Sequence, residues 1–153
     1  MTGFHHVGLT VGDLQVSIDF YCELFGCRVI QRAEGVGGDV ETITGLAGAH
    51  TLIADLAFPS GHILELIQYV SPQGRRLEQR TCDPGNTHFC IRVDDIGEAH
   101  RRLATRGVTV RSAPVDLGEA GEIWTGAKVL YALDPDGRTI ELIQTPQKTG
   151  SAS

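Results

Sequence analysis

The strongest constraint on the fold is an internal repeat. Residues 6–14 recur 82 positions later as residues 88–96, with a His, a Val, an Asp and the aliphatic residue after it in the same places. Residues 59–68 and 135–144 align at a shift of 76 positions and share the sequence Glu-Leu-Ile-Gln. Two similar shifts indicate two copies of one module that differ slightly in length.

Each copy is predicted to be a βαβββ module. The modules are expected at residues 1–70 and 87–146, joined by a linker at 71–86 and followed by a disordered tail at 147–153. Because so small a module cannot bury a sheet face alone, the copies should pack together or exchange with those of a second chain. The predicted fold class is α+β, built from paired βαβββ modules.

Hydrophobic period and turn residues place the elements within each copy. In the first copy, a strand at 4–11 precedes a helix that Asp13 caps and Gly26 ends, followed by strands at 27–32, 51–58 and 63–69. In the second copy, a strand from residue 88 precedes a helix capped by Asp94 or Asp95 and stopped at Gly107. Strands are then expected at 108–112, 128–133 and 139–145.

Two Gly-rich segments, residues 33–49 and 113–125, are predicted to be long loops and candidate binding loops or lids. The run at residues 35–38 is compatible with a phosphate cradle in composition. It neither follows a clear strand nor opens a helix, so we interpret it as flexible loop.

Composition excludes several classes of function. An apolar content of 41% excludes intrinsic disorder, and a net charge of −6 with pI near 5.4 offers no basic face to nucleic acid. No apolar run reaches the roughly 20 residues of a membrane helix, and the start lacks a signal-peptide pattern. We therefore predict a cytoplasmic protein. Its four cysteines form no CxxC pair and are expected to be free thiols.

Two glutamates and two histidines are the duplicated residues that carry chemistry. Glu65 and Glu141 lie inside aliphatic strands, where a carboxylate must face solvent or find a partner. No Lys or Arg recurs in step with both glutamates, whereas His6 and His88 do. A hydrogen-bonded core histidine is the alternative interpretation. His5, His50, His62 and His100 have no counterparts and are interpreted as ordinary surface residues.

These four side chains are predicted to be ligands of one divalent metal ion. Two neutral imidazoles and two carboxylates carry a charge of −2, which such an ion would neutralise, and mixed His and carboxylate ligation suits first-row metals. On a six-coordinate ion, four protein ligands leave two positions for water or a chelating substrate, as in a catalytic site. The ion is left open among nickel, cobalt, zinc, manganese, iron and magnesium.

The sequence resembles the vicinal oxygen chelate superfamily, which includes glyoxalase I, methylmalonyl-CoA epimerase, extradiol dioxygenases, and fosfomycin and bleomycin resistance proteins. The resemblance covers residues 4–146 and is carried by residues 6–11 (HVGLTV), 13–14, 17–18, 20–21, 134–137 (DPDG) and 140–142. It implies a cupped mixed sheet around a divalent metal, usually in a homodimer. The family's four metal positions fall on His6, Glu65, His88 and Glu141.

Within this superfamily the ligand set His, Glu, His, Glu is similar to that of bacterial glyoxalase I. That enzyme has an arginine where Thr10 stands and an asparagine near Tyr69, both used to hold glutathione. The usual second ligand of methylmalonyl-CoA epimerase is glutamine rather than Glu65, and extradiol dioxygenases use three protein ligands. Residues 44–49 and 64–69 look like those of uncharacterised glyoxalase-like proteins.

The resemblance implies a metal-dependent lyase or isomerase, glyoxalase- or epimerase-like, that stabilises an enediolate or enolate of a small oxygenated substrate. Glu141 or Glu65 would be the catalytic base. Strand phase places Thr10, Tyr69, Cys90 and Arg92 beside the ligands as substrate-binding residues. Arg92 would hold a substrate carboxylate or lie at the surface. Alternatives are an Fe(II)-dependent ring-cleaving dioxygenase, and a drug- or metabolite-binding resistance protein without catalysis.

Overall fold

The chain divides into two compact units, each with its own four-stranded sheet. The computed structural model describes residues 2–78, 80–119, 121 and 123–146, so the tail predicted at 147–153 lies outside the described residues. The units comprise residues 1–78 and 79–153. Both sheets are mixed, which confirms the α+β class predicted from the repeat.

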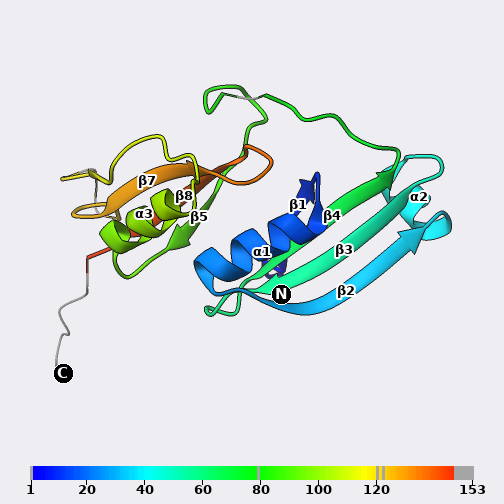
Figure 1. Ribbon diagram of the computed structural model, residues 1–153, viewed down its shortest axis with the longest axis horizontal. Coiled ribbons are helices and arrows are strands. Elements are labelled where there is room, and N and C mark those ends of the chain that lie inside the picture. Colours follow the sequence, from blue (N-terminus) through cyan, green and yellow to red (C-terminus); the bar gives the residue numbers. More distant parts are fainter. Residues whose placement is uncertain (1, 79, 120, 122, 147–153) are drawn as a thin grey trace. The chain divides into compact units, whose positions relative to one another are not determined.

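The first unit is a sheet with the strand order β1-β4-β3-β2 (Figure 1). The pair β1/β4 is parallel, whereas β4/β3 and β3/β2 are antiparallel. Its elements are β1 (His6–Val11), α1 (Leu14–Phe25), β2 (Arg28–Val36), α2 (Gly38–Thr44), β3 (His50–Ala57) and β4 (Ile63–Ser71).

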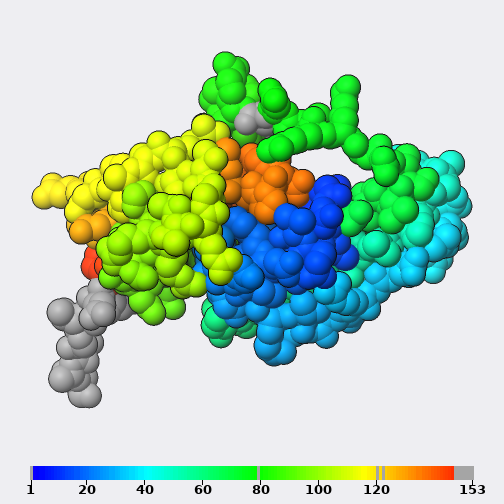
Figure 2. All heavy atoms as spheres, in the orientation of Figure 1, coloured from blue at the N-terminus to red at the C-terminus, as the bar shows by residue number. Residues whose placement is uncertain are grey.

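Helix α1 covers one face of this sheet. The Asp13 carboxylate accepts a hydrogen bond from the Val16 amide at 2.9 Å, and Gly26 ends the helix in the left-handed conformation, as predicted. In Figure 2 the outer side of the helix forms part of the blue surface. Its inner side joins the buried sheet residues in one core: Leu9, Val11, Leu14, Ile18, Tyr21, Leu24, Leu64 and Leu66.

The second unit repeats this topology with the order β5-β8-β7-β6. Asp95 caps the helix through the Glu98 amide at 2.9 Å, and Gly107 has the predicted left-handed conformation. The elements are β5 (Phe89–Arg92), α3 (Ile96–Thr105), β6 (Val115–Asp116), β7 (Lys128–Leu133) and β8 (Thr139–Gln144).

Strand register shows how closely the two copies correspond. In the first unit Gly8 on β1 lies opposite Glu65 on β4, and in the second Cys90 on β5 lies opposite Glu141 on β8. A shift of 82 positions relates Gly8 to Cys90, and a shift of 76 positions relates Glu65 to Glu141. The two sequence alignments therefore describe two neighbouring parallel strands that keep the same register in both units.

The prediction of a loop at residues 33–49 was wrong. Strand β2 continues to Val36 along β3, and α2 follows it directly. Gly35 belongs to the strand, where a side chain would overlap that of Val40. The glycine that suggested flexibility therefore allows close packing of the strand against the helix.

The strand predicted at residues 108–112 was also wrong. That segment makes a single bridge, between Val110 and Ala132, flanked by two backbone hydrogen bonds to β7. The short strand β6 pairs with the start of β7 instead. Pro114 lies between the bridge and β6, and a residue without an amide proton interrupts continuous pairing.

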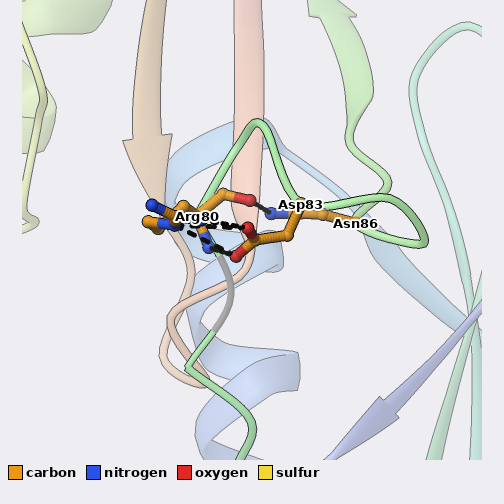
Figure 3. Close-up of polar contacts among 3 residues, drawn as sticks. All are labelled: Arg80, Asp83 and Asn86. Carbon is orange, nitrogen blue, oxygen red and sulfur yellow. Dashed lines mark hydrogen bonds and ion pairs between the residues drawn. The ribbon is translucent and has the colours of Figure 1, made fainter.

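The connection between the modules contains a hydrogen-bonded turn (Figure 3). The Arg80 amide donates to the Asp83 carboxylate at 2.8 Å, its guanidinium donates to the same group, and the Asn86 side chain donates to the Arg80 carbonyl at 2.8 Å. The hydrogen bonds from Arg80 lower the pKa of Asp83 below its ordinary value. This part of the predicted linker is therefore a defined turn.

Two further expectations concern the described residues. All four cysteines are free thiols. No helix in the described ranges has the length and apolar character needed to cross a membrane.

Candidate metal centre

His6 and Glu65 meet on the face of the first sheet opposite α1. His6 Nε2 lies 3.5 Å from Glu65 Oε2, and both side chains are partly exposed. Along β1, exposed His6 and Thr10 alternate with buried Leu9 and Val11, so the strand turns one face to the helix and the other outward. The open face carries the polar pair.

His88 and Glu141 form the equivalent pair in the second unit. His88 Nε2 lies 3.2 Å from Glu141 Oε2, and only 18% of the Glu141 side chain is exposed. His88 precedes β5, while Glu141 lies within β8 between the buried residues Ile140 and Leu142. Each unit thus brings one predicted histidine to one predicted glutamate.

No larger cluster forms within the described part of the chain. There, no group of three or more His, Cys, Asp or Glu side chains is close enough together to hold a metal ion. Each unit supplies two of the four predicted ligands, and neither has a complete donor set. The four-ligand site therefore stays a prediction.

The predicted substrate-binding residues lie on β1, β4 and β5, the strands that contain or directly follow predicted ligands. Exposed Thr10 is on β1 and half-buried Tyr69 on β4. Cys90 and Arg92 are exposed alternate residues of β5. Each of the four residues is an even number of positions from a predicted ligand on the same segment, so it shares that ligand's side of the strand.

Glu141 is flanked by a thiol and a phenol. Cys90 is next to it on β5, and Tyr131 is directly opposite it on β7. Although Cys90 is exposed as a residue, partial desolvation of its thiol raises the pKa of the thiol to about 12, and the charge of Glu141 and a hydrogen bond to Glu141 act in the same direction. Burial, Glu141 and Cys90 also raise the pKa of Tyr131. The Tyr131 ring lies against the His88 ring, with centroids 5.2 Å apart.

Tyr131 was missed in the sequence analysis, although a signal for it existed. Residues 134–137 form the turn between β7 and β8, and antiparallel pairing across that turn places Tyr131 opposite Glu141. Counting back from the turn would have identified it.

Glu65 has different neighbours. Gly8 occupies the position that Cys90 has in the second unit, and a Cβ atom added there would lie 3.3 Å from Glu65 Oε2. Asp55 on β3 is the residue opposite Glu65. The two pairs thus share their backbone positions, while the flanking side chains differ.

His5 is exposed, as predicted, and it contacts His6. Its Nδ1 lies 2.7 Å from Nδ1 of His6, within hydrogen-bond distance. The other unmatched histidines with a hydrogen-bond partner are elsewhere in the first unit: His50 bonds Glu34 and His62 bonds Ser60. The adjacency of His5 and His6 in the sequence is the signal for their contact.

Comparison with known proteins identifies relatives along nearly the whole chain. A 2-epi-5-epi-valiolone epimerase from Actinomyces is 33% identical and covers 93% of this chain and 79% of its own length. A lactoylglutathione lyase from Neisseria meningitidis is 30% identical over 97% of this chain and 93% of its own.

Solved structures share the fold. A glyoxalase family protein from Bacillus cereus matches with a TM-score of 0.73 at 23% identity, covering 94% of both chains. The fosfomycin resistance protein FosX from Listeria monocytogenes, complexed with Mn(II) and sulfate, matches with a TM-score of 0.63 at 18% identity, covering 97% of this chain and 96% of its own. Residues 3–142 match the Glyoxalase/Bleomycin resistance protein/Dioxygenase superfamily, and the chain belongs to that superfamily.

Proposed function

We propose that this protein is a metal-dependent isomerase or lyase that moves a proton next to a carbonyl group of a small oxygenated substrate. His6, Glu65, His88 and Glu141 would hold one divalent ion, either within one chain or across two chains. The observation that carries the proposal is the duplicated His–Glu pair, at 3.5 Å in one unit and 3.2 Å in the other, with the two glutamates at equivalent positions of their strands.

The donor set fits a divalent ion. Each unit offers one imidazole nitrogen and one carboxylate, a mixture that first-row divalent metals accept. Within the described residues of its own unit, neither carboxylate pairs with a lysine or arginine. Each carboxylate would therefore gain a cationic partner from a divalent ion, and one such ion would neutralise the charge of −2 that the two carboxylates carry.

The relatives favour proton transfer as the chemistry. One relative is named as an epimerase and another as a lyase. Because of the epimerase relative, the reaction to test is inversion of a carbon centre next to a ketone. In this class of site the ion, when bound, supplies Lewis-acid polarisation of substrate oxygens.

Proton transfer and substrate binding would be carried out by side chains of this protein. Glu141 or Glu65 would take the proton from the carbon beside the carbonyl and return it to product. Arg92, exposed on β5, would hold a negatively charged substrate group. Thr10 and Tyr69 would contact the rest of the substrate.

The test combines metal content with proton exchange. Protein purified without chelator should contain one divalent ion per site, and His88→Ala should lose it. The probe substrate is 2-epi-5-epi-valiolone in D₂O, in which NMR detects deuterium entering the carbon beside the carbonyl. Glu141→Gln keeps the shape and removes the base, so exchange should fall by about 10²–10⁴-fold. Glu78→Gln, at an exposed linker position, is the matched control.

A second substrate measures selectivity. Thr10 and Tyr69 stand where the resemblance to glyoxalase I implies glutathione-holding residues, so the methylglyoxal–glutathione hemithioacetal should turn over slowly. Rapid turnover would refute that inference. Substoichiometric metal in the wild type would instead favour a binding protein, and oxygen consumption would favour a dioxygenase. Full exchange in Glu141→Gln would move the base to Glu65.

A further inference from the structure

We propose that His5 is a positioning residue that fixes the tautomer and ring orientation of His6. The inference rests on the proposed function, in which His6 binds the ion through Nε2. It concerns a side chain that has no counterpart in the second copy of the repeat and is not one of the four predicted ligands.

The geometry gives each nitrogen of His6 a separate task. Nε2 lies 3.5 Å from Glu65 Oε2, on the side where the carboxylate donor is, while Nδ1 lies 2.7 Å from Nδ1 of His5. The two rings are nearly perpendicular, at 84°, with centroids 5.0 Å apart. His5 therefore contacts His6 on the side away from the proposed ion.

The hydrogen bond between the two rings determines which nitrogen of His6 carries the proton. A neutral imidazole carries one ring proton, and a metal-binding nitrogen cannot hold it. With Nε2 bound to the ion, the proton of His6 must be on Nδ1, where His5 Nδ1 accepts it. Metal-binding histidines commonly use such an outer partner, whose loss typically costs about 10–100-fold in metal affinity.

The repeat offers a matched comparison. A shift of 82 positions brings His5 to Thr87, an exposed residue next to His88. In the second unit the histidine ring instead lies against the ring of Tyr131. The two predicted histidine ligands are thus held differently, one by a hydrogen bond and the other by ring contact.

The experiment measures zinc affinity by competition with a chromophoric chelator, using the full chain. His5→Ala should weaken zinc binding about 10–100-fold, as expected for loss of an outer partner. His5→Asn, whose side-chain carbonyl can accept the proton, should recover part of the loss. Thr87→Ala should bind zinc like the wild type. Circular dichroism checks that each variant is folded.

A second readout does not depend on affinity or activity. In the zinc-loaded wild type, long-range ¹H–¹⁵N NMR should show the His6 proton on Nδ1, hydrogen-bonded to His5. Failure of the wild type to bind zinc would overturn this inference, and equal zinc binding by His88→Ala would overturn the proposed function and this inference with it. If the wild type binds zinc, His88→Ala does not, and His5→Ala matches the wild type, only the role of His5 is overturned.

Discussion

Gly8 is the residue that leaves room for the Glu65 carboxylate on the open face of the first sheet. Its partner across the parallel strands is Glu65, and an added Cβ atom would lie 3.3 Å from Oε2, closer than ordinary van der Waals contact. In the second unit Cys90 takes this position. The side chain beside the carboxylate therefore differs between the two units: Glu65 lies beside a glycine, whereas Glu141 lies beside a thiol.

We therefore expect Gly8→Ala to displace Glu65 and lower zinc affinity roughly tenfold, in the range seen when a ligand's surroundings are disturbed. Gly3→Ala is the control, because a Cβ atom there meets nothing within 4 Å. Zinc competition measures both variants. Unchanged affinity in Gly8→Ala would show that the carboxylate adjusts without cost, or that Glu65 does not bind the ion.

At the scale of elements, each module ties its first helix to the strand that carries its glutamate. Gln68 Oε1 accepts a hydrogen bond from the Leu14 amide at 2.8 Å, and Gln144 Oε1 accepts one from the Ile96 amide at 2.9 Å. Both glutamines come three residues after the glutamate of their strand. The duplicated Glu-Leu-Ile-Gln sequence thus contains a candidate ligand and a helix attachment.

Removing either attachment should destabilise the fold by about 1 kcal/mol, because one amide at the helix N-terminus loses its acceptor. Gln68→Met and Gln144→Met keep the length of the side chain and remove the acceptor. Gln73→Met, at an exposed linker position, is the control. Urea denaturation measures the free energy of unfolding. A change as small as that of the control would mean that water replaces the glutamine.

Elements with local signals could be predicted from the sequence. Asp13 with Gly26, and Asp95 with Gly107, mark the two main helices by capping chemistry that acts within a few residues. The loop predicted at residues 33–49 was wrong because glycine usually interrupts helices and strands. Gly35 instead serves tertiary packing against Val40, which no local pattern reports.

For the candidate site, the repeat could predict which residues meet but not what surrounds them. Each duplicated His lies within 3.5 Å of the Glu of its own module. Tyr131 and Asp55 face the glutamates across antiparallel pairs, so they depend on register rather than on neighbouring sequence. The contact between His5 and His6 could not be predicted from the repeat, because His5 has no counterpart in the second copy.

At the scale of the whole molecule, the repeat preserves topology while the open faces diverge. Both sheets have the same order and the same register between their parallel strands. Around the glutamates, Gly8 and Asp55 in one unit correspond to Cys90 and Tyr131 in the other. The backbone positions of the two glutamates are therefore equivalent in the two units, whereas the side chains beside them differ.

The last prediction concerns association between chains. Strand β2 is an edge strand, and every residue of it except Gly35 is exposed. Val29 and Ile30 are among its exposed apolar side chains, and an uncovered apolar edge favours contact with another chain. We expect a homodimer with twice the 16.5 kDa mass of one chain, measured by light scattering at micromolar concentration.

A charged substitution should locate the contact. Ile30→Lys places a charge on the edge and should shift the particle toward 16.5 kDa, because burying an unpaired charge in an interface is unfavourable. Val16→Lys, at an exposed apolar position on α1, is the matched control and should stay dimeric. A wild-type particle of 16.5 kDa would contradict the dimer. A dimeric Ile30→Lys protein would instead place the interface away from β2.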